Sequence, residues 1–249
     1  MTGEGWKPTR NAAVLIAALL LFWQLLYAFA GEAAIKPPLA TFRYTATLIA
    51  TDAFWVHLSE SMRAFAAALA IAVAAGLTIG FWLGFHKLSG EVCEPMLVAL
   101  YSIPKITLYP ILLLAFGLGM PAKIAFGAIH GIIPVALFTI NAVRNVRPIL
   151  IKTGRVHGLG ATEMARIILF PAALPEIFTG LRVGFSLTLI GTLLGEMFAA
   201  QRGLGYLLMT AIGLHNVDLI MAVTLLLFVF AAAASGTLLA VDRRLHART

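Results

Sequence analysis

Six long apolar stretches restrict what this chain can fold into. A helix needs roughly 20 apolar residues to cross the hydrocarbon core of a bilayer. Six stretches approach that length: residues 12–30, 64–85, 96–116, 122–141, 175–199 and 219–241. Each run is continuous rather than alternating, which favours helices over a membrane barrel. The sequence therefore predicts an all-α, polytopic membrane protein with about six transmembrane helices.

Composition excludes an ordinary soluble domain, because only 12% of the residues are charged where such a domain carries about 25%. The third and fourth stretches give weaker predictions, since they contain Lys105 and His130. The first stretch resembles a secretory signal peptide in its basic start. Its apolar run is longer than usual and no clear small-x-small cleavage site follows, so a retained span is favoured.

The basic residues follow a topology rule rather than covering one face, so we expect no nucleic-acid partner despite the net charge of +7. With the N-terminus inside, the inner segments hold Lys7, Arg10, Lys87, Arg144, Arg147, Lys152, Arg155, Arg166, Arg243, Arg244 and Arg248. The outer segments hold only Lys36, Arg43, Arg63, Lys123 and Arg202. This positive-inside bias, together with six spans, predicts that both termini are cytoplasmic.

Two parts are expected along the chain. Residues 1–56 would form an N-terminal span and an extracytoplasmic loop, in which residues 42–58 form either an interfacial helix or an ordinary packed loop. Residues 57–249 would form the main transmembrane domain. Within it, Gly76, Gly80 and Gly84 recur every four residues and share one helix face. This face suits helix packing within the subunit, and a dimer interface is the alternative.

Several polar residues lie at membrane depth. Lys105, His130 and Glu196 each cost a few kcal/mol there unless they face a cavity or a partner, and Thr188 and Thr192 share a face of the fifth stretch. One interpretation is that these residues line a polar translocation pathway. Lys105 and His130 can both be cationic, which would favour an anionic solute. The alternative is that Lys105 reaches the inner headgroups, Glu196 reaches the outer surface, and the hydroxyls bond to their own helix.

No catalytic constellation occurs in the sequence. It lacks the G-x-x-x-x-G-K-[ST] phosphate-binding loop, the H-E-x-x-H zinc motif and paired cysteines,. Glu91 and Glu94 are three residues apart, a spacing that a metal site could use, but a solvated helix start is favoured. We therefore expect no enzyme activity, no metal and no cofactor in this chain.

A basic segment, residues 141–174, separates the fourth and fifth apolar stretches. It carries Arg144, Arg147, Lys152, Arg155 and Arg166 against the single acid Glu163, and it ends with Pro171 and Pro175. The charge bias places it in the cytoplasm. A bilayer anchor has no need of such a segment, whereas a charged helix between two spans suits the docking of another protein.

The basic segment resembles the EAA loop of the permease subunits of ATP-binding-cassette (ABC) importers, whose signature reads E-A-A-x-x-x-G, nine residues, then I-x-L-P. Gly158, Ile168 and Pro171 match this spacing. The E-A-A positions are occupied by Lys152, Thr153 and Gly154, and Phe170 replaces the leucine. The flanking motifs resemble the nitrate/sulfonate/taurine/bicarbonate branch: Ser102–Pro110, Phe116–Gly119, Pro171–Pro175, Thr179–Arg182, Gly195–Met197 and Gly203–Tyr206.

The resemblance implies a type I ABC importer permease of the bacterial inner membrane, in which residues 57–249 form the permease domain and about 142–174 the ATPase-coupling loop. It implies an ATPase dimer that binds ATP and Mg²⁺, an extracytoplasmic solute-binding protein and a second permease copy, either identical, giving the favoured homodimer, or a different paired chain. The coupling residues would be Lys152, Thr153, Gly154, Arg155, Gly158, Gly160, Ile168 and Pro171. Gly158 and Gly160 would form a sharp turn. Lys152 stands where an acid is usual, which reverses the charge offered to the ATPase.

Two other classes of function are considered beside the importer. An ion-coupled secondary transporter would use Lys105, His130 and Glu196 to move ions, but it would leave the basic segment unexplained. A membrane scaffold without a pathway is the third class. The sequence does not identify the solute, because specificity in such importers rests largely on the binding protein.

Overall fold

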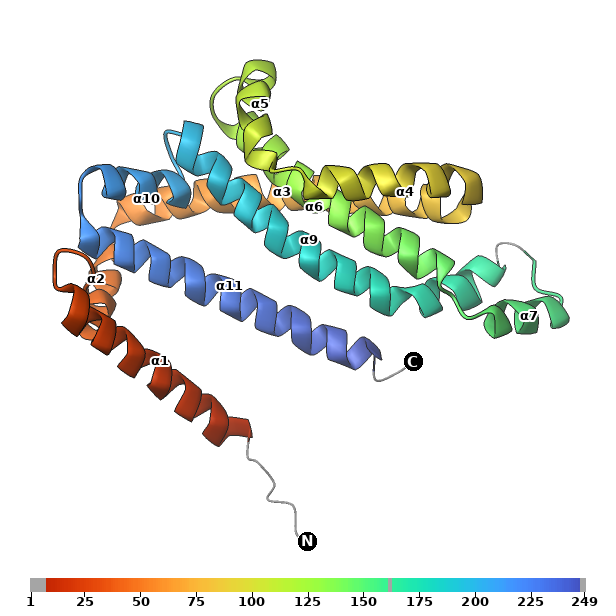
Figure 1. Cartoon of the computed structure of the whole chain (residues 1–249), viewed down its shortest axis with the longest axis horizontal. Coiled ribbons are helices and arrows are strands. Elements are labelled where there is room, and N and C mark those ends of the chain that lie inside the picture. The colour runs from red at the N-terminus through yellow and green to blue at the C-terminus, as the bar shows by residue number, and fades with distance from the viewer. Residues whose placement is uncertain (1–7, 161–162, 247–249) are drawn as a thin grey trace, which may run out of the picture. The chain divides into compact units, whose positions relative to one another are not determined.

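The computed structural model describes residues 8–160 and 163–246, and no strand occurs among them. Lys7 and Arg248, two residues assigned above to the inner side, lie outside the described residues. The helices are α1 (Pro8–Ala30), α2 (Pro38–Ile49), α3 (Asp52–Phe85), α4 (Lys87–Ser102), the 3-10 helix η1 (Lys105–Leu108), α5 (Tyr109–Phe116), α6 (Met120–Arg144), α7 (Pro148–Val156), the π-helix η2 (Met164–Leu169), α9 (Phe170–Ala199), α10 (Leu204–Gly213) and α11 (Val217–His246) (Figure 1). The all-α prediction is confirmed.

Among the described residues, five helices are long and apolar enough to cross a membrane, and one bent pair raises the number to six. The five lie within α1, α3, α6, α9 and α11. The second span starts earlier than expected, because α3 begins at Asp52 rather than at residue 64. The sequence leaves two possibilities for residues 42–58, an interfacial helix or a packed loop. In the structure these residues belong to α2 and to the start of α3.

The third expected span, residues 96–116, is not one continuous helix, and this corrects the sequence prediction. The chain bends by 89° between α4 and the following η1 and α5. Ile103 has the extended backbone angles φ −67° and ψ 134°. The residue that precedes a proline is disfavoured in the helical region, so Pro104 explains the break. The element is therefore a broken span or a re-entrant loop.

The chain divides into two compact units, Met1–Trp55 with Leu207–Phe228, and Val56–Tyr206 with Val229–Thr249. Residues 207–228 thus cluster with the N-terminal part, which the sequence did not indicate. In the smaller unit, the indole of Trp23 donates a hydrogen bond to the carbonyl of Lys36 at 3.0 Å, and Lys36 pairs with Asp218 at 3.7 Å. The apolar side chains of α1 are exposed, as expected of a helix that faces lipid.

In the larger unit, α6 packs against α3 and α9 through glycines. On α3, a Cβ at Gly76 would lie 2.6 Å from the Cβ of Val135, and a Cβ at Gly80 would collide with Thr139. On α6, a Cβ at Gly131 would lie 2.8 Å from Ala72 and would collide with the hydroxyl of Thr188 on α9. Such close backbone approach is how helices associate in lipid, where no hydrophobic force drives them together.

The glycine face of α3, which carries Gly76, Gly80 and Gly84, is therefore occupied within the chain by α6. We expect Gly80→Leu to lower the free energy of unfolding by about 1–3 kcal/mol, because overpacking forces helices apart. Thermal unfolding of the detergent-solubilised protein measures the change. Gly236→Leu is the matched control, since nothing lies within 4 Å of a Cβ there. Equal stability of the two variants would contradict the packing.

Candidate functional site

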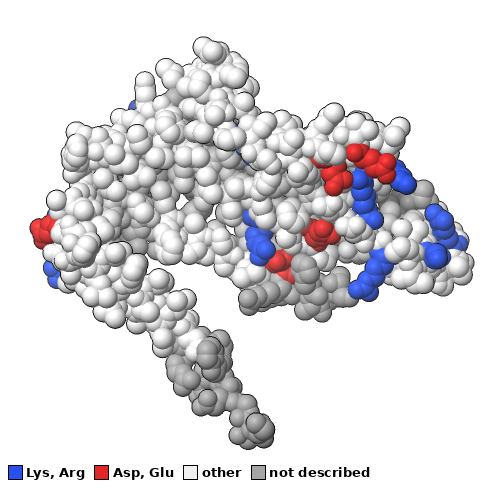
Figure 2. Space-filling model, viewed as in Figure 1, with Lys and Arg blue, Asp and Glu red and all other residues white. Residues whose placement is uncertain are grey.

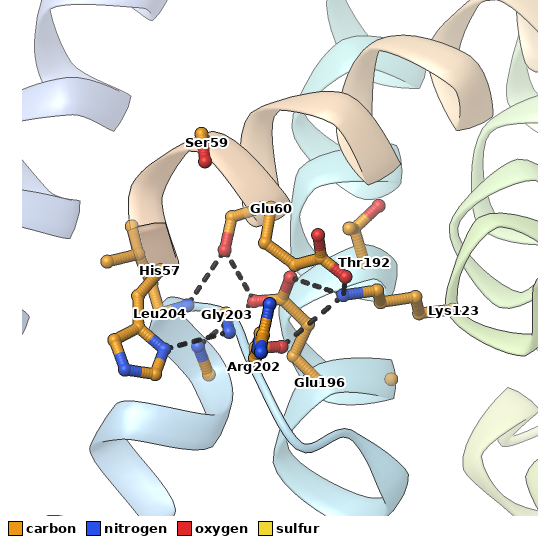
Figure 3. Close-up of polar contacts among 12 residues, drawn as sticks. His57, Ser59, Glu60, Lys123, Thr192, Glu196, Arg202, Gly203 and Leu204 are labelled. Atoms are coloured by element: carbon orange, nitrogen blue, oxygen red, sulfur yellow. Dashed lines mark hydrogen bonds and ion pairs between the residues drawn. The ribbon is translucent and has the colours of Figure 1, made fainter. Parts of the chain in front are cut away.

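Lys123, in the first turn of α6, lies in a buried ion-pair centre formed with Glu60 of α3 and Glu196 of α9. Its ammonium is 3.2 Å from Glu60 Oε1 and 3.4 Å from Glu196 Oε1, and it donates to the carbonyl of Arg202 at 3.3 Å (Figure 3). Lys123 is 1% exposed and Glu196 is 0% exposed. The ion-pair centre therefore joins three helices, with Lys123 and Glu196 buried and Glu60 half-buried.

Glu196 also fixes the turn that leads into α10. Its Oε2 accepts hydrogen bonds from the hydroxyl of Ser61 at 2.7 Å and from the N–H of Gly205 at 3.1 Å. The Ser61 oxygen in turn accepts from the N–H of Leu204 at 2.8 Å. Free N–H groups at a helix start need such acceptors, and a carboxylate there also meets the positive end of the helix dipole. Glu196 and Ser61 thus cap α10.

Gly203 makes this arrangement possible. Its φ of +127° lies in a region that suits glycine,, and a Cβ there would collide with the Glu196 carboxylate. The N–H of Gly203 donates to His57 Nδ1 at 3.1 Å, and the His57 ring stacks on Tyr206 with centroids 5.8 Å apart. The motifs Gly195–Met197 and Gly203–Tyr206 therefore meet at one place.

Lys123 is the functional residue that the sequence analysis missed, because counting charges by segment treated it as an outer surface lysine. Two signals point to its real place. It follows Pro121 inside the first turn of an apolar helix, and Glu60 and Glu196 are available as partners. The expectation that Glu196 reaches the outer surface is wrong, since Glu196 is fully buried.

Thr188 and Thr192 lie in the contact between α6 and α9 rather than beside a cavity. Both are buried, and the face of α6 opposite them is glycine, Gly127 and Gly131. The Thr192 hydroxyl donates to the carbonyl of Thr188 at 2.9 Å, in its own helix. The Thr188 hydroxyl has no hydrogen-bond partner among the described residues. The own-helix interpretation therefore describes Thr192 alone.

Lys105 and His130 lie on different helices. Lys105 donates to the carbonyl of Tyr101 at 2.9 Å and lies over the Tyr101 ring, 4.9 Å from its centroid, so it caps the end of α4. His130 is half-buried, with Nδ1 2.8 Å from the carbonyl of Phe126 and its ring against Gly191. Lys105 thus lies at the start of η1, directly after the break, and His130 lies within α6.

Within the basic segment, α7 packs on η2 through Gly154. A Cβ on Gly154 would lie 2.6 Å from Met164 Cε and 2.7 Å from Ile168 Cδ1, so a larger residue here would displace the ends of these two side chains. Gly158 ends the helix with φ +70°, which confirms the predicted turn there. Gly160 does not share that conformation, and its N–H instead donates to Glu163 Oε2 at 3.1 Å. Residues 161–162 lie outside the described residues.

The outer face of the basic segment is exposed and of mixed character. Two exposed cations lie here, Lys152 and Arg155, with the exposed polar residue Thr153 between them. Lys152 has no ion pair among the described residues. Apolar side chains are exposed around them: Ile149, Val156, Ile167 and Phe170. On the face shown in Figure 2, most charged side chains of the larger unit lie toward the end that carries α7.

A groove of about 540 Å³ lies beside α7. Its walls come from the end of α6, from α7 and from the beginning of α9, and they include Arg147, Leu150, Ile168, Pro171 and Glu176. Pro171 stands at the start of α9 and Pro175 lies inside that helix. The segment is therefore a folded, largely exposed projection on the bundle rather than a loose loop.

Several of the described helices are long and apolar enough to cross a membrane, so the fold is that of a multi-pass membrane protein. A chain of the MetNI methionine ABC transporter, solved in inward-facing conformations, matches it with a TM-score of 0.65 and 20% identity over 75% of this chain and 93% of that chain. Residues 72–247 match the family described as binding-protein-dependent transport system inner membrane component. The chain belongs to this family, which confirms the predicted permease subunit, its inner-membrane location and the resemblance.

Curated relatives cover nearly the whole chain. The taurine transport system permease protein TauC of Escherichia coli (strain K12) is 25% identical over 96% of this chain and 91% of its own length. The nitrate import permease protein NrtB of Synechocystis is 30% identical over 80% of this chain and 75% of its own. The riboflavin transport system permease protein RibX of Chloroflexus aurantiacus is 29% identical over 90% and 87%.

Removing the Glu196 carboxylate leaves Lys123 with Glu60 as its remaining acidic partner, and it takes the acceptor from Ser61 and from the N–H of Gly205. We expect Glu196→Ala to lower the free energy of unfolding by about 3–5 kcal/mol, measured by thermal unfolding in detergent. Glu91→Ala is the control, because Glu91 is exposed and its pair with Lys87 spans 4.0 Å, so this change should leave stability nearly unaltered. A Glu196→Ala variant as stable as the control would show that the centre contributes nothing.

Proposed function

We propose that this chain is the permease of an ATP-driven importer for a small anionic solute, and that a separate cytoplasmic ATPase docks on the basic segment. The single observation that carries the docking is the exposed face of α7, where Val156 is 86% exposed and Ile149 is 64% exposed beside Lys152 and Arg155. Apolar anchors surrounded by charge are typical of protein interfaces.

Lys152 is expected to contact an acidic residue of the ATPase. The position is usually acidic in the family that the sequence resembles, and here an exposed lysine stands there. An acid on the cognate ATPase would complement it, with Arg155 one turn farther along. ATP and Mg²⁺ would be bound by the ATPase, because this chain contains no phosphate-binding loop. The hydrolysis of ATP would then move the docked segment as a rigid body.

An anionic solute is supported by two independent observations. Taurine, nitrate and aliphatic sulfonates, the solutes in the names of three relatives, all carry an acidic or anionic oxygen group. Lys105 lies in the broken span, directly after the break, and broken helices commonly border the substrate route in transporters. The riboflavin relative shows that the family is not restricted to anions, so direct uptake measurements are decisive.

A second copy of the chain would complete the pathway. The exposed sides of α4 and α5 carry apolar residues such as Val92, Met96, Ile111 and Leu114, and their break exposes polar backbone that membranes tolerate only beside protein or water. A homodimer would cover the exposed apolar side chains of α4 and α5 and would also place protein beside the backbone at their break. An extracytoplasmic binding protein would deliver the solute, as the family description implies.

The alternative, an ion-coupled secondary transporter, would need Glu196 to exchange protons or ions with an open route. In the structure Glu196 is fully buried and engaged by Lys123, Ser61 and Gly205. The two functions separate in proteoliposomes that contain this chain alone. Uptake driven by an ion gradient would establish the alternative, and uptake that requires the ATPase, ATP and the binding protein would establish the importer.

Docking is tested by Val156→Asp. A carboxylate placed on an exposed apolar anchor should reduce the ATPase that co-purifies with the chain by about tenfold, equivalent to about 1.4 kcal/mol. Leu118→Asp is the matched control, because Leu118 is also strongly exposed but lies in the turn between α5 and α6. Normal recovery of ATPase with the Val156→Asp variant would refute docking at this face.

The pathway is tested by Lys105→Gln and His130→Gln. Loss of the Lys105 ammonium or of the His130 ring should slow the initial uptake of radiolabelled taurine or nitrate by about tenfold, whichever the wild-type complex transports. Lys87→Gln is the control, because the Lys87 side chain is 89% exposed. The amount of co-purified ATPase shows whether assembly is intact. Unchanged uptake in both variants would mean that these residues serve only the fold.

A further inference from the structure

Arg144, the last residue of α6, binds two other helices of the larger unit. Its Nη1 is 2.8 Å from Glu94 Oε2 on α4. Its Nη2 donates to the carbonyl of Leu83, near the end of α3, at 3.4 Å, and to the carbonyl of Lys87, at the start of α4, at 3.3 Å. One planar guanidinium thus serves three acceptors, a geometry that a lysine cannot reproduce.

Helix α4 packs closely against the Arg144 guanidinium. Gly90 faces it so closely that a Cβ would overlap Nη2 of Arg144 and would also meet the carbonyl of Leu83. The Arg144–Glu94 distance of 2.8 Å is typical of strong charge-assisted hydrogen bonds. By contrast, the neighbouring pair of Lys87 and Glu91 spans 4.0 Å and is exposed. Of these two pairs, only the one with Arg144 fixes α4 to another helix.

These contacts give two charged residues partners that the sequence did not indicate. The charge count assigns Arg144 only to the inner side, and the structure shows three hydrogen bonds from it within the chain. The sequence favours a solvated helix start for Glu94, yet this residue pairs with Arg144. Among the described residues no group of three or more metal-binding side chains occurs, so the pair has no metal-binding explanation either.

The position of Arg144 along the chain gives the contact a mechanical meaning. Only residues 145–147 separate it from Pro148, the first residue of α7. That connection is tight, with hydrogen bonds from the N–H of Asn145 to Asn141 and from the N–H of Leu150 to Arg147, and with Val146 buried. The C-terminal end of α4 leads directly into the break, after which η1 begins at Lys105.

We propose that Arg144 is a positioning residue that makes α4 follow the basic segment during the transport cycle. Movement imposed on α7 by the ATPase reaches α6 through the short connection, passes to α4 through Arg144 and Glu94, and arrives at the break before Lys105. A packed helix transmits such movement as a rigid body. The inference rests on the proposed docking of the ATPase, and it adds the route by which docking reaches the pathway.

The test is hydrogen–deuterium exchange of the full permease–ATPase complex, with and without Mg-ATP and vanadate. In the wild type we expect vanadate trapping to change amide exchange in both α7 and α4. In Glu94→Gln the change in α7 should persist, while the change in α4 falls by at least about fivefold, the lower end of ordinary coupling between two sites. Glu91→Gln, one helical turn away and exposed, should behave as the wild type.

Four outcomes decide the proposal. If Glu94→Gln raises exchange in α4 equally in both nucleotide states, the contact is only structural and the inference fails. If the double variant Arg144→Glu with Glu94→Arg restores part of the nucleotide effect that Arg144→Glu loses, the charge contact is established as the link. If the ATPase does not bind the wild-type chain, the proposed function itself fails, whereas binding with a nucleotide effect confined to α7 overturns only this inference.

Discussion

The rest of the structure depends on the close approach of α6 to α3 and α9. In lipid, helices gain little from leaving the solvent, so association rests on dispersion between surfaces that touch over many atoms. Gly76 and Gly80 on α3, Gly131 on α6 and Gly184 on α9 leave no room for larger side chains. This packing sets the register of the three helices and thereby brings Lys123 level with Glu60 and Glu196.

Charged contacts then fix the ends of these helices. The ion-pair centre ties α6 to α3 and α9 at one end of α6, and Arg144 ties α6 to α3 and α4 at the other. Arg182 of α9 and Asp242 of α11 form a third contact at 3.4 Å. Glycine packing alone would allow helices to slide, whereas these charges, buried at Lys123 and Glu196 and half-buried at Arg144 and Arg182, resist sliding because it would leave them unpaired,.

The existence and type of most elements could be predicted from the sequence, because long apolar runs have few alternatives. The spans of α6 and α9 and the turn at Gly158 follow in this way. The residues that form the sites were harder to predict. Lys123, Glu94 and Arg144 are ordinary charges in a linear count, and only the packing of distant helices shows that they pair. The start of α3 was misplaced for a related reason, since polar residues 52–63 continue the helix beyond the apolar run.

The contact between Gly203 and Glu196 has a consequence for how such chains can change over time. The two positions share one small volume, because the carboxylate that caps α10 occupies the place of the missing side chain at residue 203. Neither position can accept a new residue independently. A sequence with alanine at position 203 would need a shorter side chain at position 196, and that change would leave Lys123 with Glu60 as its remaining acidic partner. Positions 123, 196 and 203, which belong to two helices and a turn, therefore form a single unit of variation.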